Sequence, residues 1–447
     1  MAMGKRETER QDELFITHDR LPKSPGHVFY VKLNQLLAEA QFDRWVEALC
    51  EPHYAQGKGR PSIPPGTYFR MLLVGYFEGL NSQRGIAWRC SDSLSLRAFL
   101  AVPLDEEAPD HSSLSYIRNR LPLEAHQHVF VKVLAIAQEK KLLKGKTVAV
   151  DSTTLEVNAA MKSIVRRDTE EDWNEYLTRL MQEQGLAKAG EEPSAEELRR
   201  FDKTRKNKKV SNDEWQSPTD PDARIARMKD GTTHLAYKAE HVLDLDTEII
   251  LAAEIYHATQ HDTTTLEDSV VQAQVNQQAA GSEQAIKNAV ADKGYHSNDT
   301  LTNFAEHQTI RTYIPEPQRR HECTWTDKPA EQKAAVVANR RRTRGDRGRK
   351  LQRLRSERVE RSFAHVCETG GARRTWLTGI DKVRKRYLIS AAAHNLGVLM
   401  RQLFKMGTPR GLQQFRKDLQ GIVTFLYFAW LIILGCPNRS ERSLRRA

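Results

Sequence analysis

The fold is decided by Thr147-Val148-Ala149-Val150-Asp151-Ser152-Thr153-Thr154, a β-branched, apolar run that ends in an acid and three hydroxyl residues. Short apolar runs rich in β-branched residues indicate strands inside a sheet. In open α/β sheets, functional side chains gather at the carboxyl ends of the strands. We therefore expect a central strand that presents Asp151 at its carboxyl end.

A second apolar run, at residues 288–291, also ends in an acid, Asp292. Between the two acids lie two β-rich stretches joined by a turn, and a helical stretch. Further helical and strand patterns follow Asp292. The expected order is strand, hairpin, helix, strand, helix, strand, helix, which predicts an α/β protein with a mixed sheet flanked by helices. If their strands are neighbours, Asp151 and Asp292 lie within reach of one metal ion.

The composition and the hydrophobic pattern of the sequence change several times along its 447 residues, and we therefore expect several regions. The first part after the N-terminal arm is helical in pattern, with helix starts marked at Pro64-Pro65 and Asp110-His111. The expected regions are a polar arm at 1–27, a helical DNA-binding or assembly domain at 28–143, a catalytic domain at 144–370 with a charged helical insertion at about 160–230 and a basic arm at about 318–350, and a C-terminal helical segment at 371–447.

Composition favours a polyanionic partner. Lysine and arginine number 69 against 58 acids, a formal charge of +11, which suits nucleic acid or an anionic membrane surface. One apolar run, at 422–434, is shorter than the roughly 20 residues that span a membrane, so a buried helix or a subunit contact is the better interpretation. The N-terminus shows no secretory signal pattern and the five cysteines suggest no disulfide framework. These features predict a cytoplasmic protein without a membrane partner.

A third acid is expected on the helix that follows the basic arm. Glu357 and Glu360 lie three residues apart on it, beside an apolar stripe of Val359, Phe363 and Val366 that would dock the helix on the sheet. A glutamate at that place fits a metal site approached by phosphates. The alternative is a solvated basic helix with ordinary ion pairs.

Several strings along the chain carry a family resemblance. They are residues 79–84 with 109–114 in the first region, 148–158 (VAVDSTTLEVN), 220–243, 257–262 (HATQHD), 291–296 (ADKGYH), 360–365 (ERSFAH) and 391–401 (AAAHNLGVLMR). In this order the chain resembles the DDE transposases of bacterial insertion sequences. That resemblance implies an RNase-H-like catalytic core behind an N-terminal helical domain.

The resemblance also implies a catalytic and metal-binding triad. Asp151 and Asp292 match the two aspartates of the family and Glu360 matches its glutamate. Many relatives show Tyr-x2-Arg-x3-Glu-x6-Lys around that glutamate. Counted from Glu360, these positions hold Arg353, Ser356 and Cys367; counted from Glu357, Arg353 fits but Lys350 and Ala364 do not. Glu-Arg-x-Phe is the better local match, so we expect Glu360 as the third ligand, with Glu357 in reserve.

The function implied is cleavage at the ends of an insertion element and joining of those ends to target DNA. The hypothesis is a phosphoryl transfer with two Mg²⁺ ions, for which Mn²⁺ is a substitute. The expected partners are double-stranded DNA and further copies of the chain, as a homodimer or a larger homo-oligomer in the bacterial nucleoid. The alternatives are an RNase-H-fold nuclease without strand transfer and a catalytically inactive DNA-binding relative.

Basic residues near the acids and along the arm are the expected DNA contacts. For Lys238, Lys293 and His296 the alternative is an ordinary surface charge. In the arm, basic residues are denser than a solvated surface needs. The expected contacts are Lys238, Lys293 and His296, with Arg342, Arg344, Arg347, Arg349, Arg353, Arg355, Arg358 and Arg361.

Overall fold

The computed structural model describes residues 17, 26–55, 62–188, 192–205, 211–228, 231–306, 309–318, 325 and 328–409. Most of the polar arm expected at 1–27 lies outside these residues. So does the stretch 410–447, which contains the apolar run at 422–434 and most of the expected C-terminal segment.

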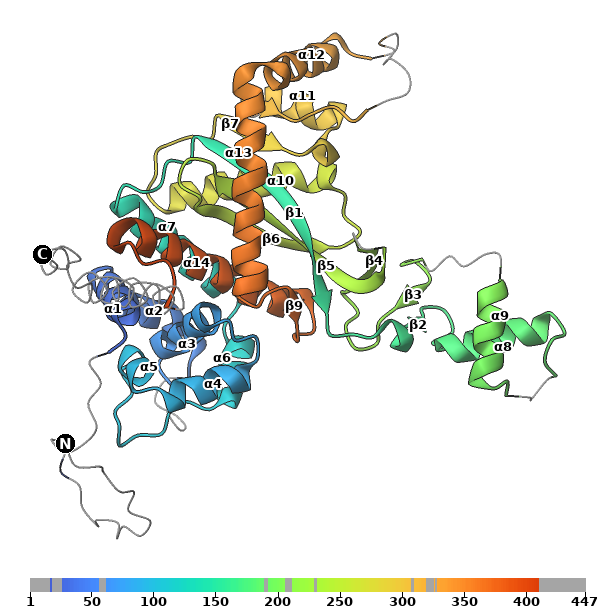
Figure 1. Ribbon diagram of the computed structural model, residues 1–447, viewed down its shortest axis with the longest axis horizontal. Helices are drawn as coiled ribbons and strands as arrows, with labels where there is room; N and C mark the ends of the chain where they lie inside the picture. The colour runs from blue at the N-terminus through green and yellow to red at the C-terminus, as the bar shows by residue number, and fades with distance from the viewer. Residues whose placement is uncertain are drawn as a thin grey trace, which may run out of the picture.

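A mixed sheet forms the centre of the molecule (Figure 1). Its main strands are β1 (Thr147–Val157), β5 (Thr233–Asp244), β6 (Ile250–His257), β7 (Asn288–Ala291) and β8 (Arg311–Tyr313). Their spatial order is β6-β5-β1-β7-β8. The hairpin β5–β6 pairs antiparallel with β1, while β7 and β8 run parallel to β1. This RNase-H-like arrangement confirms the mixed sheet expected from the sequence, with the strand of Asp151 at its centre.

Helices cover both faces of the sheet. Helix α10 (Asp262–Ala279) packs on β5 and β6 from one face, and α11 (Asn298–Glu306) lies beside it. Helices α13 (Asp346–Phe363) and α14 (Ile380–Phe404) pack on the other face, and Figure 1 shows α13 crossing the sheet. Val148, Ala149 and Val150 are fully buried between these layers, which explains their unbroken apolar sequence.

Seven α-helices precede the sheet in the part of the chain that the structure describes. They are α1 (Val28–Glu39), α2 (Phe42–Cys50), α3 (Pro65–Glu78), α4 (Gln83–Asp92), α5 (Leu94–Phe99), α6 (His111–Arg120) and α7 (Leu123–Glu139). Helix α3 begins after Pro64, and the Asp110 side chain accepts a hydrogen bond from Ser112 N at the start of α6, as the sequence predicts. Helix α14 packs against α3 and α7, so one continuous hydrophobic core joins these helices to the sheet.

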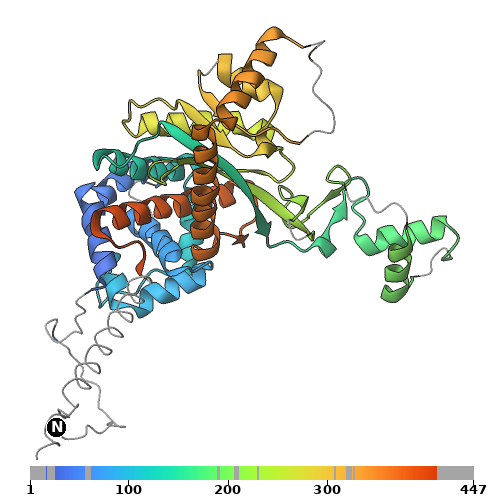
Figure 2. The ribbon, with the colours of Figure 1, turned by 45° about the horizontal axis from the view of Figure 1, so that its top comes forward.

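A helical insertion projects from the far end of β1 (Figures 1 and 2). The short strands β2 (Val165–Arg166) and β3 (Trp215–Gln216) pair antiparallel. The chain between them forms α8 (Trp173–Glu183) and α9 (Ala195–Thr204). Both helices start with a capping box, and Leu177, Met181, Leu198 and Phe201 form a small core of their own. Both helices lie within the range 160–230 at which the charged helical insertion is expected. The strand β4 (Arg224–Arg227) then returns the chain to the sheet by pairing with β5.

The segment expected as a basic arm is helical in its second half. Helix α12 (Ala330–Arg344) and the start of α13 occupy it, and Gly345 separates them. Helix α12 buries a narrow face of Ala335, Val336 and Asn339. On that face the Asn339 side chain is fully buried and bonds both Ile314 N and Ile314 O, which anchors the helix to the end of β8.

The end of α13 passes into a π-helical turn (Ala364–Thr369), and the strand β9 (Arg374–Thr375) then pairs with the end of β1. Within the described ranges, every helix is too short or too polar to cross a membrane.

Candidate active site

The two expected aspartates lie side by side on neighbouring parallel strands. Val150 on β1 is in register with Ala291 on β7. Asp151 directly follows Val150, and Asp292 directly follows Ala291. Neighbouring strands are about 4.8 Å apart. The Asp292 side chain caps the short helical turn that follows by accepting a hydrogen bond from Lys293 N. The sheet register therefore brings the two acids together, as the sequence predicts.

Asp151 faces helix α13. Arg355 Nη1 lies 2.7 Å from Asp151 Oδ2, and the two side chains are 12% and 26% exposed. Gln352, one turn earlier on α13, donates a hydrogen bond of 3.1 Å to Ala291 O, and Val359, one turn later, is fully buried. Positions 352, 355 and 359 thus form the side of α13 that docks on the sheet. The residue that α13 presents to Asp151 is an arginine.

The two candidate glutamates lie on other sides of α13. Glu360 is exposed, about 100° around the helix from Val359, and accepts a hydrogen bond of 3.1 Å from Ser356. Glu357 is exposed, about 200° around from Arg355, and pairs with Arg361. Among the described residues, no three Asp, Glu, His or Cys side chains are grouped to hold a metal ion. The structure therefore brings together the two aspartates, and it does not group either glutamate of α13 with them.

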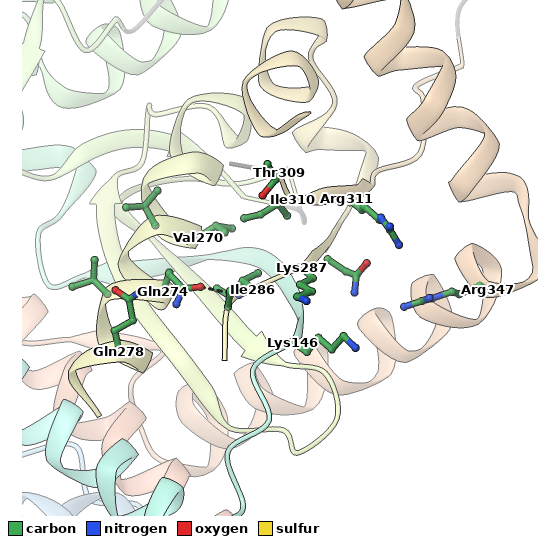
Figure 3. Close-up of a pocket in the computed structure, with 14 residues that line it drawn as sticks. Lys146, Val270, Gln274, Gln278, Ile286, Lys287, Thr309, Ile310, Arg311 and Arg347 are labelled. Carbon is green, nitrogen blue, oxygen red and sulfur yellow. Dashed lines mark hydrogen bonds between the residues drawn. The ribbon is translucent and has the colours of Figure 1, made fainter. Parts of the chain in front are cut away.

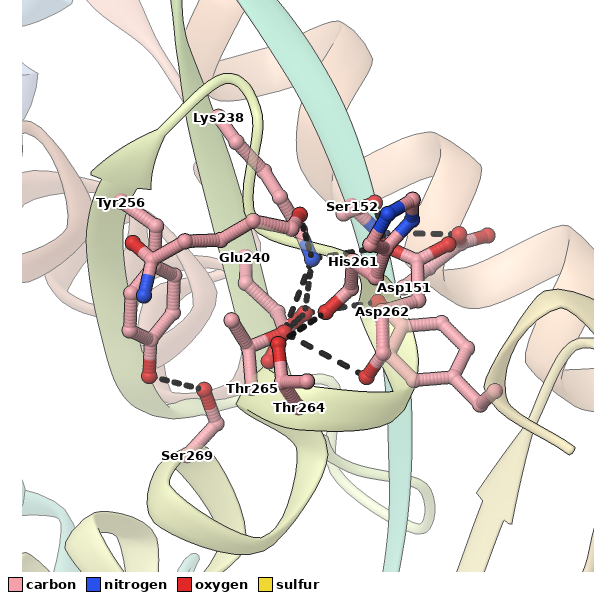
Figure 4. Close-up of polar contacts among 12 residues, drawn as sticks. Asp151, Ser152, Lys238, Glu240, Tyr256, His261, Asp262, Thr264, Thr265 and Ser269 are labelled. Atoms are coloured by element: carbon pink, nitrogen blue, oxygen red, sulfur yellow. Dashed lines mark hydrogen bonds and ion pairs between the residues drawn. The ribbon is translucent and has the colours of Figure 1, made fainter. Parts of the chain in front are cut away.

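A second polar cluster lies on the other side of β1 (Figure 4). Lys238 Nζ is 2.7 Å from Asp262 Oδ1 and 3.4 Å from Glu240 Oε2. Ser152 Oγ donates to Asp262 Oδ1 at 3.0 Å, which ties the residue after Asp151 to the first turn of α10. An added Cβ at Gly294 would lie 3.0 Å from Asp262 Oδ2, so the chain just after Asp292 also approaches this acid. Asp262 therefore lies between the chain segments that carry Asp151 and Asp292.

Glu240 is the most deeply buried acid of this cluster. It is fully buried, and its Oε2 accepts hydrogen bonds of 2.8 Å from Thr265 and Tyr295. Its Oε1 has no hydrogen-bond partner among the described residues. Burial raises the pKa of Glu240, and the neighbouring Lys238 ammonium opposes that rise. Burial also raises the pKa of Tyr295, and the charge of Glu240 adds to it.

An open hollow of about 590 Å³ lies against the cluster. Ser152, Lys238, Asp262 and Arg373 are among the residues that line it. Arg373 Nη1 donates to Thr153 Oγ1 at 2.8 Å and to Thr154 O at 2.9 Å, which places its charge along β1. The hollow thus combines cationic side chains with an acid beside the Asp151–Asp292 pair, a combination suited to an approaching phosphate chain.

The expected DNA contacts fall into two groups in the structure. Several are exposed and available to solvent: Lys293, Arg344, Arg347, Arg349 and Arg353. The others are engaged within the protein. Lys238 is 7% exposed and ion-paired, and His296 Nε2 lies buried 4.0 Å from Glu316 Oε1.

The remaining arginines of this second group also bind protein groups. Arg342 donates to Thr312 O at 3.0 Å, Arg355 pairs with Asp151, and Arg358 donates to Leu245 O. Arg361 Nη1 lies 2.7 Å from Glu248 Oε1. Their contacts with DNA stay predictions, and each such contact would have to compete with the intramolecular one.

Sequence reasoning missed Asp262, Glu240, Ser152 and Tyr295 as members of the site. All four lie in strings that carry the resemblance: Ser152 in 148–158, Glu240 in 220–243, Asp262 in 257–262 and Tyr295 in 291–296. A search for acids in every such string would have found Asp262 and Glu240. No string shows the burial of Glu240, because that burial depends on the antiparallel register that sets it opposite Ser152.

Two family models match the chain. A transposase domain (DUF772) matches residues 17–120, and a transposase DDE domain matches residues 315–400, which include both candidate glutamates. No curated protein and no solved structure gives a match. The two matches bracket the sheet that carries Asp151 and Asp292. They confirm the resemblance drawn from the sequence: the chain carries the domains of a DDE transposase of an insertion element.

Proposed function

We propose that this transposase cuts DNA at the ends of its element and joins those ends to target DNA by metal-assisted phosphoryl transfer. The observation that carries the proposal is the parallel register that sets Asp151 beside Asp292 within a chain that contains a transposase DDE domain. Paired carboxylates at the carboxyl end of neighbouring strands offer the oxygen ligands that Mg²⁺ prefers.

The residues that would hold Mg²⁺, or Mn²⁺ in its place, are Asp151, Asp292 and Glu360. All three are carboxylates, the ligand type that Mg²⁺ prefers; the two aspartates lie on neighbouring strands, whereas Glu360 lies on another side of α13. Two bound ions would activate a water or a DNA 3′-hydroxyl and stabilise the leaving oxygen. Glu360 is the proposed third ligand because it matches the family motif. Its exposed position leaves its carboxylate open to a ligand that approaches along α13.

The residues of the chain itself bind and orient. Arg355 holds the Asp151 carboxylate at 2.7 Å, which fixes its direction beside Asp292. Ser152, Asp262 and Lys238 fix the next turn of chain on the other side of β1. Exposed Lys293 and the arginines of α13 would contact phosphates on either side of the reacting one, because charge-assisted contacts to phosphate position DNA without reading its bases.

Product analysis tests this proposal. Labelled duplexes that carry the DNA flanking the coding region are incubated with the full chain, Mg²⁺ and an unlabelled target duplex. The proposal predicts products longer than the substrate, formed by joining, and predicts that a chelator prevents them. Products that are cut and never joined would support a nuclease instead, and DNA that is bound and left intact would support a DNA-binding protein without catalysis.

A further inference from the structure

A hollow lies at the end of the strands opposite the aspartates. Its volume is about 800 Å³, and it lies between α10, the starts of β7 and β8, and the first turn of α13. Figure 3 shows Lys146, Lys287, Arg311 and Arg347 around it. These four residues are called the cationic row below. Of these four residues, Arg347 alone lies in the basic arm expected at about 318–350.

The sheet register builds this row. Lys146 precedes β1, Lys287 precedes β7 and Arg311 opens β8. Lys287 N donates to Lys146 O and Arg311 N donates to Lys287 O, each at 2.9 Å, so the three residues lie side by side across the sheet. Lys146 and Lys287 precede the paired residues Thr147 and Asn288, whereas Arg311 is itself paired with Asn288, one residue beyond Lys287. Backbone hydrogen bonds therefore hold three cationic residues on adjacent segments at one end of the sheet.

The charge of the row is not neutralised by the protein. All four side chains are exposed, and none forms an ion pair with a residue that the structure describes. The other described residues that line the hollow include no aspartate or glutamate. Half-buried Arg342 adds charge behind the row, and the proximity of Arg311 helps burial to lower the pKa of Arg342. Four like charges this close favour a polyanionic ligand.

We propose that the cationic row is a second DNA-binding surface, which holds the sugar-phosphate backbone of duplex DNA away from the reacting phosphate. This inference rests on the proposed action on DNA and adds a binding surface to it. The lining favours backbone over bases, because among the described residues it has no aromatic side chain on which a base could stack. Cations gathered at one end of a rigid sheet suit the closely spaced phosphates of a duplex.

The position of the row relative to the aspartates fits one continuous duplex. From Lys287 to Asp292 the chain runs five residues along β7, which corresponds to roughly 16 Å at about 3.3 Å per residue. That is less than half of a DNA helical turn of about 34 Å. Helix α13 connects the two places, since Arg347 lies at the row and Arg355 at Asp151.

Salt-dependent DNA binding tests the row. The full chain is compared with a triple variant, Lys146→Ala, Lys287→Ala and Arg311→Ala, by fluorescence anisotropy on a labelled duplex at several salt concentrations. A matched control removes one arginine and two lysines that are exposed in the helical insertion, outside the regions expected to bind DNA: Lys162→Ala, Arg199→Ala and Lys203→Ala. Circular dichroism and thermal unfolding establish that each variant is folded.

The expected result is an affinity at least about tenfold lower near 0.15 M salt, and a slope of log K against log salt shallower by about 3, because three phosphate contacts are lost. The control should change both far less. Equal affinity and slope for the triple variant and the unaltered chain would overturn the inference, as would an equal loss in the control. Cleavage at saturating protein should survive in the triple variant. Failure of the unaltered chain to cut DNA would instead count against the proposed function, and the binding comparison would still decide the role of the row.

Discussion

Arg355 Nη1 on α13 lies 2.7 Å from Asp151 Oδ2 on β1, across 204 residues of sequence. The contact is largely shielded from solvent, and it gives the first expected metal ligand a cationic partner. A guanidinium and a metal ion would compete for the same carboxylate. If Asp151 binds a metal as proposed, the ion pair would weaken that binding.

Replacing Arg355 should strengthen metal binding. In Arg355→Gln the competing charge is lost, and because such pairs contribute about 1 kcal/mol, the affinity for Mg²⁺ or Mn²⁺ should rise about fivefold. Calorimetric titration of the DNA-free protein measures it. Arg349→Gln is the matched control, since Arg349 is an exposed arginine of the same helix that pairs with Asp346. An unchanged or lower affinity in Arg355→Gln would show that the pair does not gate the site.

The two glutamates of α13 should differ in their effect on cleavage. Glu360→Gln should lower the cleavage rate by at least about 100-fold if its carboxylate completes the metal site. Glu357→Gln should lower it little, because Glu357 pairs with Arg361 on a side of the helix turned away from the sheet. Rates with saturating DNA and Mg²⁺ make the comparison. The reverse pattern would make Glu357 the third ligand.

Loss of Lys238 should destabilise the protein. Lys238→Met leaves Asp262 and fully buried Glu240 without their cation, and breaking a buried pair costs about 3 kcal/mol. Chemical unfolding measures this change, with Lys293→Met as the control because Lys293 is exposed. Adding Glu240→Gln to Lys238→Met should restore part of the loss, since it removes one uncompensated charge. A Lys238→Met variant as stable as the control would mean that the cluster does not support the fold.

Stability should fall in mild acid through a buried histidine on α7. Burial lowers the pKa of His126 to about 4, below its ordinary value of 6.5. Between these values the unfolded chain binds a proton at His126 and the folded protein does not. The free energy of unfolding should therefore decrease as the pH falls from about 6.5 to about 4, by up to about 3 kcal/mol from this group.

His126→Gln should remove that share of the pH dependence, and chemical unfolding at a series of pH values measures it. His128→Gln is the matched control, because His128 is exposed on the same helix. If both variants kept the pH dependence of the unaltered protein, the buried imidazole would not be its source.

The sheet could be predicted from the sequence because its central strands appear there as short apolar runs. The apolar runs before Asp151 and Asp292 are buried on both faces, so their composition shows burial directly. Helix α12 could not be distinguished from an irregular arm, because its docking depends on Asn339 and on the end of β8. A polar residue that anchors a helix looks, in sequence, like any exposed one.

Part of the site could be predicted because Asp151 and Asp292 each follow a strand that is recognisable in the sequence. Parallel pairing of the two strands brings their carboxyl ends together. The contact between Ser152 and Asp262 spans 110 residues, and the burial of Glu240 depends on register, so neither has a local pattern. The cationic row is likewise a product of register, since its first three members are scattered singly along the chain.

The most direct test of the central claim is cleavage of element-end DNA by Asp151→Asn and Asp292→Asn. Both variants keep the size of the side chain and remove its charge, so DNA binding and thermal unfolding should stay close to those of the unaltered chain. We expect each variant to lose at least about 1000-fold in the Mg²⁺-dependent cleavage rate. Folded variants that cut DNA at the original rate would contradict that claim.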